Sequence, residues 1–182
     1  DVEAMPDKSI DVCFFNGAVR NEEQEYLAKL LRQKSKVLVA FGSCAHQGGI
    51  PGLANVADRK EIFATVYLES PSTANPHGVV PQTRFKVPEG ELKLPEFFDT
   101  VRTLDQVVDV DYYLPGCPPT AKRIGAAVEA IAKGALPPKG TVLGPEKSVC
   151  DECKRKKEDK KISKIYRVYE IVPDTERCLL EQ

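Results

Sequence analysis

The chain has 182 residues, enough for one α/β domain with a small additional segment. Hydrophobic residues make up 42% and charged residues 29% of it, which is the balance of a globular protein and not of a disordered one. The formal net charge of −1 provides no overall attraction to nucleic acid or to anionic membranes. No apolar run approaches the roughly 18–20 residues that a spanning helix needs, so we expect no membrane span. No signal peptide is visible.

Two strands joined by a helix are predicted in the first part of the chain. Ile10–Phe15 is an apolar strand, and Asn21 with Gln24 forms a capping box that opens a helix ending at about Gln33. Val37–Phe41 is an apolar run rich in β-branched residues, typical of a strand buried on both faces. This order indicates a βαβ unit and a parallel sheet. The expected apolar stripe of the helix is Tyr26, Leu27, Leu30 and Leu31.

A strand followed by a glycine and a cysteine occurs twice in the sequence. Cys44 follows Val37–Phe41, and Cys117 follows a second predicted strand at Val110–Leu114. Open α/β sheets place their ligands at the carboxyl ends of parallel strands. We therefore expect Cys44 and Cys117 to face the same corner of one sheet.

Local signals predict the segments between these strands. Residues 46–55 contain several glycines and a proline and are expected to form a loop. Asp58 and Glu61 form a second capping box, which opens a helix ending at about Leu68. The proline-rich stretch from Ser70 to Glu96 is predicted to be a long surface excursion, and loops of that length are usually functional or contact a partner. A last helix is expected from Pro118 to about Lys133.

The six cysteines are the most informative residues of the chain. Disulfide frameworks are typical of small secreted domains with poor cores, whereas this chain has a core, so we expect a reducing compartment and thiolates that act as ligands. Cys13 lies inside an apolar strand and is expected to be a plain core residue. The remaining candidate ligands are Cys44, Cys117, Cys150, Cys153 and Cys178.

The composition changes after Gly140, which suggests a domain of residues 1–140 and a smaller one of residues 141–182. Cys150 and Cys153 form a C-x-x-C pair, and Cys178 follows 25 residues later. Three thiolates complete neither a closed zinc site nor a 4Fe–4S site, both of which take four ligands. From the residues alone, an iron–sulfur site, a zinc site and a redox or incidental C-x-x-C all stay open.

Both the sheet and the ligand count require more residues than the chain supplies. A parallel α/β sheet should have an opening strand and helix before Ile10, and Cys44 with Cys117 leaves two cluster ligands unaccounted for. We therefore expect the missing strand and ligands upstream of Asp1. The basic run Lys154–Lys161 contains two acidic residues and no aromatic ones, which favours a solvated or partner-facing segment over nucleic-acid binding.

Several motifs, in order along the chain, resemble the small subunit of nickel–iron hydrogenases. The resemblance runs from about Ile10 to Gln182 and is greatest to the cytoplasmic methyl-viologen-reducing type that works with heterodisulfide reductase in methanogenesis. The chain is also similar to the 20-kDa subunit family of NADH–quinone oxidoreductase. The motifs are GAVRNEEQEYLAKLLRQKSKVLVAFGSCAHQGGIPGLAN, ESPSTANP, VDYYLPGCPP, CDECKRKK and ERCLLEQ.

The resemblance implies an α/β fold with a flavodoxin-like parallel sheet, whose first strand is missing here, and a small, irregular C-terminal iron–sulfur domain. It also implies ligands of two 4Fe–4S clusters. Cys44 and Cys117 match two ligands of the proximal cluster, and Cys150, Cys153 and Cys178 match three ligands of the distal cluster. The remaining ligands and a medial cluster are implied to lie outside this sequence. His46 stands where many members carry a cysteine that is not a ligand, so no role is assigned to it.

The implied function is a cytoplasmic electron-transfer subunit that does not itself split hydrogen. It would relay electrons between a nickel–iron large subunit and an electron-accepting iron–sulfur subunit of a heterodisulfide reductase-type complex. Two alternatives are an iron–sulfur subunit of a quinone-linked complex and a zinc-stabilised interaction module. The C-x-x-C pair with Cys178 argues against the first, because that family ends soon after its single cluster. The second predicts a colourless protein with zinc and no sulfide.

Overall fold

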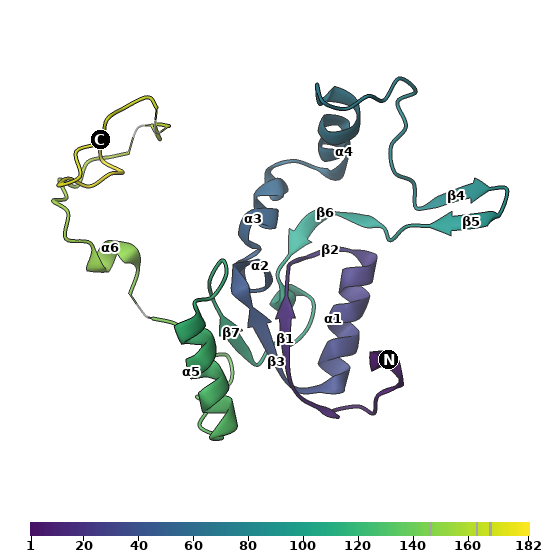
Figure 1. The fold of residues 1–182 in the computed structure, drawn as a ribbon, viewed down its shortest axis with the longest axis horizontal. Coiled ribbons are helices and arrows are strands. Elements are labelled where there is room, and N and C mark those ends of the chain that lie inside the picture. Colours follow the sequence, from purple (N-terminus) through teal and green to yellow (C-terminus); the bar gives the residue numbers. More distant parts are fainter. Residues whose placement is uncertain (146, 163, 168) are drawn as a thin grey trace. The chain divides into compact units, whose positions relative to one another are not determined.

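A computed structural model describes residues 1–145, 147–162, 164–167 and 169–182 (Figure 1). The chain forms two compact units, Asp1–Gly144 and Pro145–Gln182. The larger unit is mixed α/β and contains every named strand of the described chain. None of the helices built from described residues is long and apolar enough to cross a membrane.

Three parallel strands form the central sheet of the larger unit. They are β1 (Ile10–Asn16), β3 (Ser35–Phe41) and β7 (Tyr112–Leu114), in the order β1-β3-β7. Leu38, Val39 and Ala40 of the middle strand are almost completely buried, because apolar side chains cover both faces of a parallel sheet. The prediction of a parallel α/β sheet is thus confirmed, and β3 is the doubly buried strand that its composition indicates.

Helix α1 (Glu22–Lys34) connects β1 and the short strand β2 (Val19–Asn21) to β3. Its predicted capping box is present, since the Asn21 side chain accepts from the Gln24 backbone and the Gln24 side chain accepts from the Asn21 backbone. The buried face differs from the predicted stripe. Ala28 is completely buried, whereas Tyr26 is 51% exposed and Leu27 is also exposed. Tyr26 points to the rim of the unit, where its hydroxyl donates to Glu3.

Asp111, just before β7, joins three elements of the larger unit. Its carboxylate lies 2.6 Å from Arg32 Nη1 at the end of α1 and 2.5 Å from Lys139 Nζ, and it accepts from the Leu38 backbone N–H of β3 at 2.8 Å. Burial disfavours ionisation of Asp111, but the hydrogen bonds from Arg32, Lys139 and Leu38 outweigh it and lower its pKa to about 2. The carboxylate therefore holds the end of α1 against two strands of the sheet.

A second, antiparallel pair connects β2 to β6 (Phe97–Arg102). Asn55 of the 3₁₀ turn η2 (Leu53–Val56) holds β6 in place, because its amide exchanges two hydrogen bonds with the Val101 backbone. The buried Arg20 of β2 lies over the Phe97 ring at 4.5 Å from its centroid and donates to Asn55. Sequence patterns did not predict this small sheet.

The excursion between Ser70 and Glu96 is more ordered than predicted. It contains a β-hairpin of β4 (Arg84–Val87) and β5 (Gly90–Lys93), with Phe85 opposite Leu92 and Lys86 opposite Glu91. The hairpin follows helix α4 (Arg59–Phe63), which the predicted capping box at Asp58 opens and which continues as a π-helical turn η3 (Ala64–Glu69). The prolines concealed the alternation of charged and apolar residues that specifies the hairpin.

The remaining elements lie at the ends of the larger unit and in the smaller one. Helix α5 (Ala121–Ala132) begins at a Thr120 cap, three residues after the predicted start, and the 3₁₀ turns η1 (Val2–Ala4) and η4 (Leu104–Gln106) precede β1 and β7. The smaller unit holds one short helix, α6 (Val149–Glu152), and an isolated bridge between Lys156 and Arg177 among its described residues.

Candidate functional site

Cys44 lies directly beyond the carboxyl end of β3. The chain turns at Gly42, whose φ of +85° favours glycine, and continues as the short helix α2 (Gly42–Gln47). A second short helix, α3 (Gly49–Gly52), follows. The loop predicted after Cys44 is therefore wrong, because two helical turns meet at the left-handed Gly48. Cys44 sits in the first turn of α2 and is partly exposed.

Cys117 lies beyond the carboxyl end of β7, next to the segment that holds Cys44. The backbone N–H of Ser43 donates to the Gly116 carbonyl oxygen at 2.8 Å, so the two cysteine-bearing turns are directly hydrogen-bonded. Gly116 has a φ of +144°, and a Cβ at this position would lie 2.4 Å from Pro119 Cα. The turns can pack this closely only because the glycines have no side chain.

Gly49 is a site residue that sequence reasoning missed. Its φ is +52°, and a Cβ built on it would lie 3.0 Å from the Cys44 sulfur. Gly49 therefore leaves the space around the Cys44 thiol open. The glycine pair a few residues after Cys44 was the available signal, but spacing alone did not show that α3 folds back onto the cysteine.

His46, also in α2, packs inside the larger unit. Its ring lies 4.7 Å from the Tyr113 ring, and its Nδ1 is buried with no hydrogen-bond partner among the described groups. Burial lowers the pKa of His46 below the usual value of a histidine. Its contacts are those of a packed aromatic side chain.

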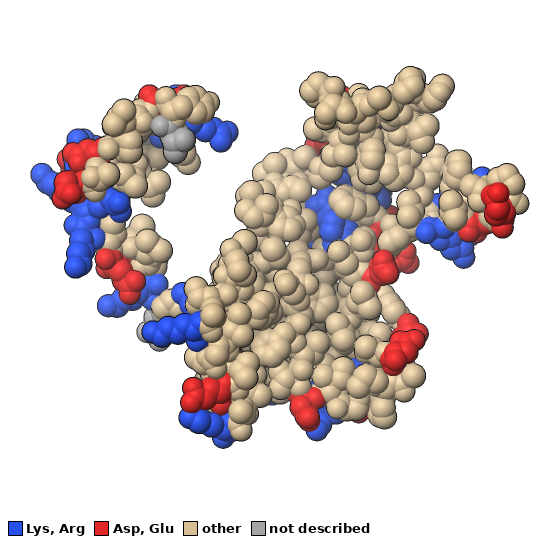
Figure 2. Space-filling view, in the orientation of Figure 1, with Lys and Arg blue, Asp and Glu red and all other residues tan. Residues whose placement is uncertain are grey.

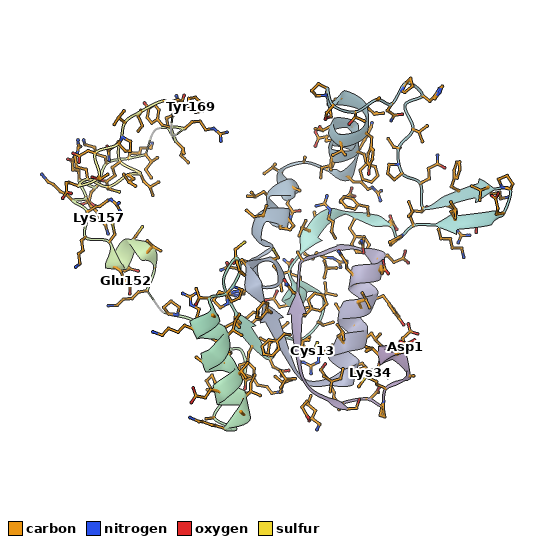
Figure 3. All side chains as sticks on the ribbon, in the orientation of Figure 1. Asp1, Cys13, Lys34, Glu152, Lys157 and Tyr169 are labelled. Carbon is orange, nitrogen blue, oxygen red and sulfur yellow. The ribbon has the colours of Figure 1, made fainter. Side chains whose placement is uncertain are left out.

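Cys13 packs against the core from strand β1, as predicted, and Figure 3 shows it on that strand. Burial raises the pKa of its thiol, and a hydrogen bond with Ser35 offsets only part of this effect. A buried thiol with a raised pKa is a poor metal ligand and a poor nucleophile. Cys13 therefore differs from the other cysteines in its chemistry.

The other three cysteines lie in the smaller unit. Cys150 is exposed in α6, and Cys153 ends this helix with its N–H donated to the Cys150 carbonyl oxygen at 3.4 Å. Cys178, distant in sequence, donates its N–H to the Lys156 carbonyl oxygen at 2.8 Å. Hydrogen bonds from the Arg155 backbone and side chain lower the pKa of Cys153, which favours its thiolate.

The arrangement provides two partial sets of soft ligands. All six cysteines are free thiols, and no three His, Cys, Asp or Glu side chains of the described residues converge as the site of a single metal ion. An iron–sulfur cluster is larger than one ion and takes one thiolate per iron, four for a 4Fe–4S cluster. Cys44 with Cys117 fits two such positions by chemistry and placement, and Cys150, Cys153 and Cys178 fit three.

Comparison with known proteins identifies the family. The family model described as the NADH ubiquinone oxidoreductase 20 Kd subunit matches residues 1–131. The chain belongs to this family. Among the relatives of this 20 Kd subunit family member is the iron-sulfur subunit of the F420-non-reducing hydrogenase of Archaeoglobus profundus. It is 49% identical to this chain over 100% of the chain and 58% of the relative.

Two further comparisons also lead to hydrogenases. The NAD-reducing hydrogenase HoxS subunit delta of Cupriavidus necator is 30% identical over 74% of the chain and 60% of its own length. The crystal structure of an NAD⁺-reducing [NiFe]-hydrogenase in the H₂-reduced state superposes with a TM-score of 0.61 at 33% identity, covering 70% of this chain and 66% of that one. The resemblance predicted from the sequence motifs is thus confirmed. The chain spans a little over half the length of its curated F420-non-reducing relatives.

Proposed function

We propose that this chain is an iron–sulfur electron-relay subunit of a nickel–iron hydrogenase. The observation that supports it most directly is the hydrogen bond between Ser43 and Gly116, which places Cys44 and Cys117 on adjacent turns at one edge of the sheet. Its relatives are named as hydrogenase subunits, and one of them as an iron-sulfur subunit. A bound 4Fe–4S cluster would supply one-electron chemistry, while the chain would position it and set its surroundings.

The larger unit would hold part of a proximal cluster in a flavodoxin-like domain of residues 1–140. Cys44 and Cys117 would each give one thiolate, and the open space beside Gly49 leaves the Cys44 sulfur accessible. Backbone N–H groups at the glycine turns are suited to donate to cluster sulfurs, which is a general way in which proteins tune such centres. The other two ligands would come from residues outside this chain.

The smaller unit would hold part of a distal cluster in an irregular domain of residues 141–182. Cys150, Cys153 and Cys178 would be three of its ligands. Thiolates bind iron because they are soft, charged donors, and the lowered pKa of Cys153 makes deprotonation easier at neutral pH. The fourth ligand and a medial cluster would lie outside this chain.

The proposed partners follow from the relay. One is the nickel–iron large subunit, where hydrogen is activated, and the other is an electron-accepting iron–sulfur subunit of a heterodisulfide reductase-type complex in the cytoplasm. The segment Ser70–Glu96 would help to hold the large subunit, because it exposes a row of apolar side chains. Four of these are more than half exposed, namely Val79, Phe85, Leu92 and Leu94.

The test is an iron, acid-labile sulfide and zinc assay, with EPR before and after exposure to hydrogen. It is made on the complex purified without air. We expect about twelve irons per small subunit, the content of three four-iron clusters, provided that no other iron–sulfur subunit co-purifies. We also expect EPR signals that appear on reduction by hydrogen. Zinc without sulfide would reject the relay and favour a zinc-stabilised interaction module, and a single cluster that reacts with quinone would favour the quinone-linked alternative.

A further inference from the structure

Four consecutive basic residues, Lys154–Lys157, are exposed on the smaller unit beside its cysteines. Figure 2 shows basic side chains projecting from this unit. Lys157, labelled in Figure 3, donates from Nζ to the Cys150 carbonyl oxygen at 2.6 Å. The Lys156 carbonyl oxygen accepts from the Cys178 N–H, and Arg155 hydrogen-bonds to Cys153. The run therefore contacts all three cysteines of the unit.

The charges of this run are not neutralised within the described part of the chain. No carboxylate of the described residues lies within ion-pair distance of Lys154–Lys157, whereas two lysines further along the unit are paired. Lys160 lies 2.5 Å from Glu158, and Lys164 lies 3.1 Å from Glu170. Residues 145–182 contain ten basic and nine acidic residues, so the patch results from their distribution and not from an excess of charge.

We propose that Lys154–Lys157 is the docking surface for a redox protein that has acidic side chains around its own redox centre. The proposal rests on the proposed relay function, because the cysteines beside the patch would hold the cluster that exchanges electrons. Exposed, unpaired charges steer an oppositely charged partner and increase its association rate by about 10- to 1,000-fold at low salt. A partner attracted to this run would bring its redox centre next to the cluster.

Two observations favour a protein partner over nucleic acid. Glu158 and Asp159 follow the run immediately, and like charges facing a phosphate backbone would oppose binding. The run also has no aromatic side chain within it on which bases could stack. An acidic protein surface can place its carboxylates opposite the four cations and avoid Glu158 and Asp159.

The experiment uses the hydrogen-reduced hydrogenase complex with its full-length small subunit, and an acidic two-cluster ferredoxin as the probe. The test variant is Lys154→Gln/Lys156→Gln, because both side chains are exposed and make no hydrogen bond or ion pair among the described residues. The matched control, Lys160→Gln/Lys164→Gln, removes the same charge from paired lysines. The bimolecular rate constant of ferredoxin reduction is measured as a function of ionic strength.

We expect the wild-type rate constant to fall steeply with salt. The test variant should be about three- to tenfold slower than wild type at low salt, with a shallower salt dependence, while the control stays close to wild type. Equal rate constants for the test and control variants, or a wild-type rate independent of salt, would overturn the proposal. A labelled single-stranded oligonucleotide that binds more tightly than ferredoxin, and is lost in the test variant, would also overturn it.

Equilibrium binding of oxidised ferredoxin separates docking from electron relay. Salt-dependent binding that weakens in the test variant supports the docking surface even if EPR finds no distal cluster, in which case only the relay function fails. A distal cluster seen by EPR, together with binding that is the same in both variants, leaves the relay function standing and rejects the docking surface.

Discussion

The Ser43 backbone N–H donates to the Gly116 carbonyl oxygen at 2.8 Å, and this single bond joins the ends of strands that lie more than seventy residues apart in the chain. Each of these residues directly precedes a cysteine. The bond therefore fixes the separation of Cys44 and Cys117 through rigid backbone, and the placement does not depend on flexible side chains.

Replacing either strand-end cysteine should remove the proximal cluster. In the assembled complex, Cys44→Ala and Cys117→Ala should each lose about four irons, because a 4Fe–4S cluster takes one thiolate per iron. Iron analysis and EPR of the hydrogen-reduced complex measure the loss. Cys13→Ala is the control, and it should keep every cluster because this thiol packs in the core. Full iron content in both strand-end variants would show that these cysteines are not ligands.

Gly49→Ala should disturb the surroundings of Cys44. The substitution places a methyl group 3.0 Å from the Cys44 sulfur at a φ of +52°, and the backbone strain alone should cost about 1 kcal/mol of stability. Thermal unfolding of the chain and the EPR line shape of the complex are the two measurements. The matched control is Gly52→Ala in the same helix, where a Cβ meets no atom within 4 Å. If both variants behave alike, the space beside Cys44 has no role.

Asp111→Asn should destabilise the larger unit in a pH-dependent way. The pKa of Asp111 falls from an ordinary 3.8 to about 2, and a shift of this size corresponds to about 2 kcal/mol. Because the folded-state pKa is lowered, this stability is fully present above about pH 4 and is lost as the pH falls towards 2. Urea unfolding of wild type and variant across this range measures the difference, which should shrink on acidification.

The exposed pair of Lys36 and Asp11 provides the control for Asp111. The Asp11 side chain is 82% exposed, so its ion pair is screened by solvent, and Asp11→Asn should change stability little at any pH. A loss as large as that of Asp111→Asn would contradict the interpretation that burial makes the Asp111 bonds strong.

The two faces of the β4–β5 hairpin should differ in their importance for assembly. Phe85→Ser/Leu92→Ser removes a cross-strand apolar pair whose members are 54% and 57% exposed, and it should reduce co-purification of the large subunit. Lys86→Ser/Glu91→Ser changes the neighbouring cross-strand pair, on the other face, and should leave assembly intact. Equal yields of complex from the two variants would mean that the large subunit does not contact this hairpin.

Local chemistry explains which elements could be predicted from the sequence. The capping boxes at Asn21 and Asp58 are short-range patterns, and both form as predicted. The β4–β5 hairpin was missed because its strands have four residues each and lie between prolines. The position of Cys44 after a buried strand was predictable, but the helical turns after it depend on left-handed glycines whose conformation no single-sequence pattern specifies.

Contacts between distant residues limited the prediction of the site. The strand-end pattern predicts that Cys44 and Cys117 share a sheet edge, and the Ser43–Gly116 bond places their turns side by side. The folding of Gly49 onto the Cys44 sulfur and the pairing of Lys156 with Arg177 involve backbone geometry that leaves no trace in composition or periodicity. These features required coordinates.

The hydrogen bonds between Lys156 and Cys178, and between Lys157 and Cys150, make the basic run dependent on its cysteines. If the cysteines bind a cluster, the metal holds these backbone segments in place and with them the spacing of the four cations. A subunit that has not received its cluster would present the same charges without that fixed spacing. Partner recognition would then act as a checkpoint for maturation, because only a subunit able to pass electrons would display the complete recognition surface.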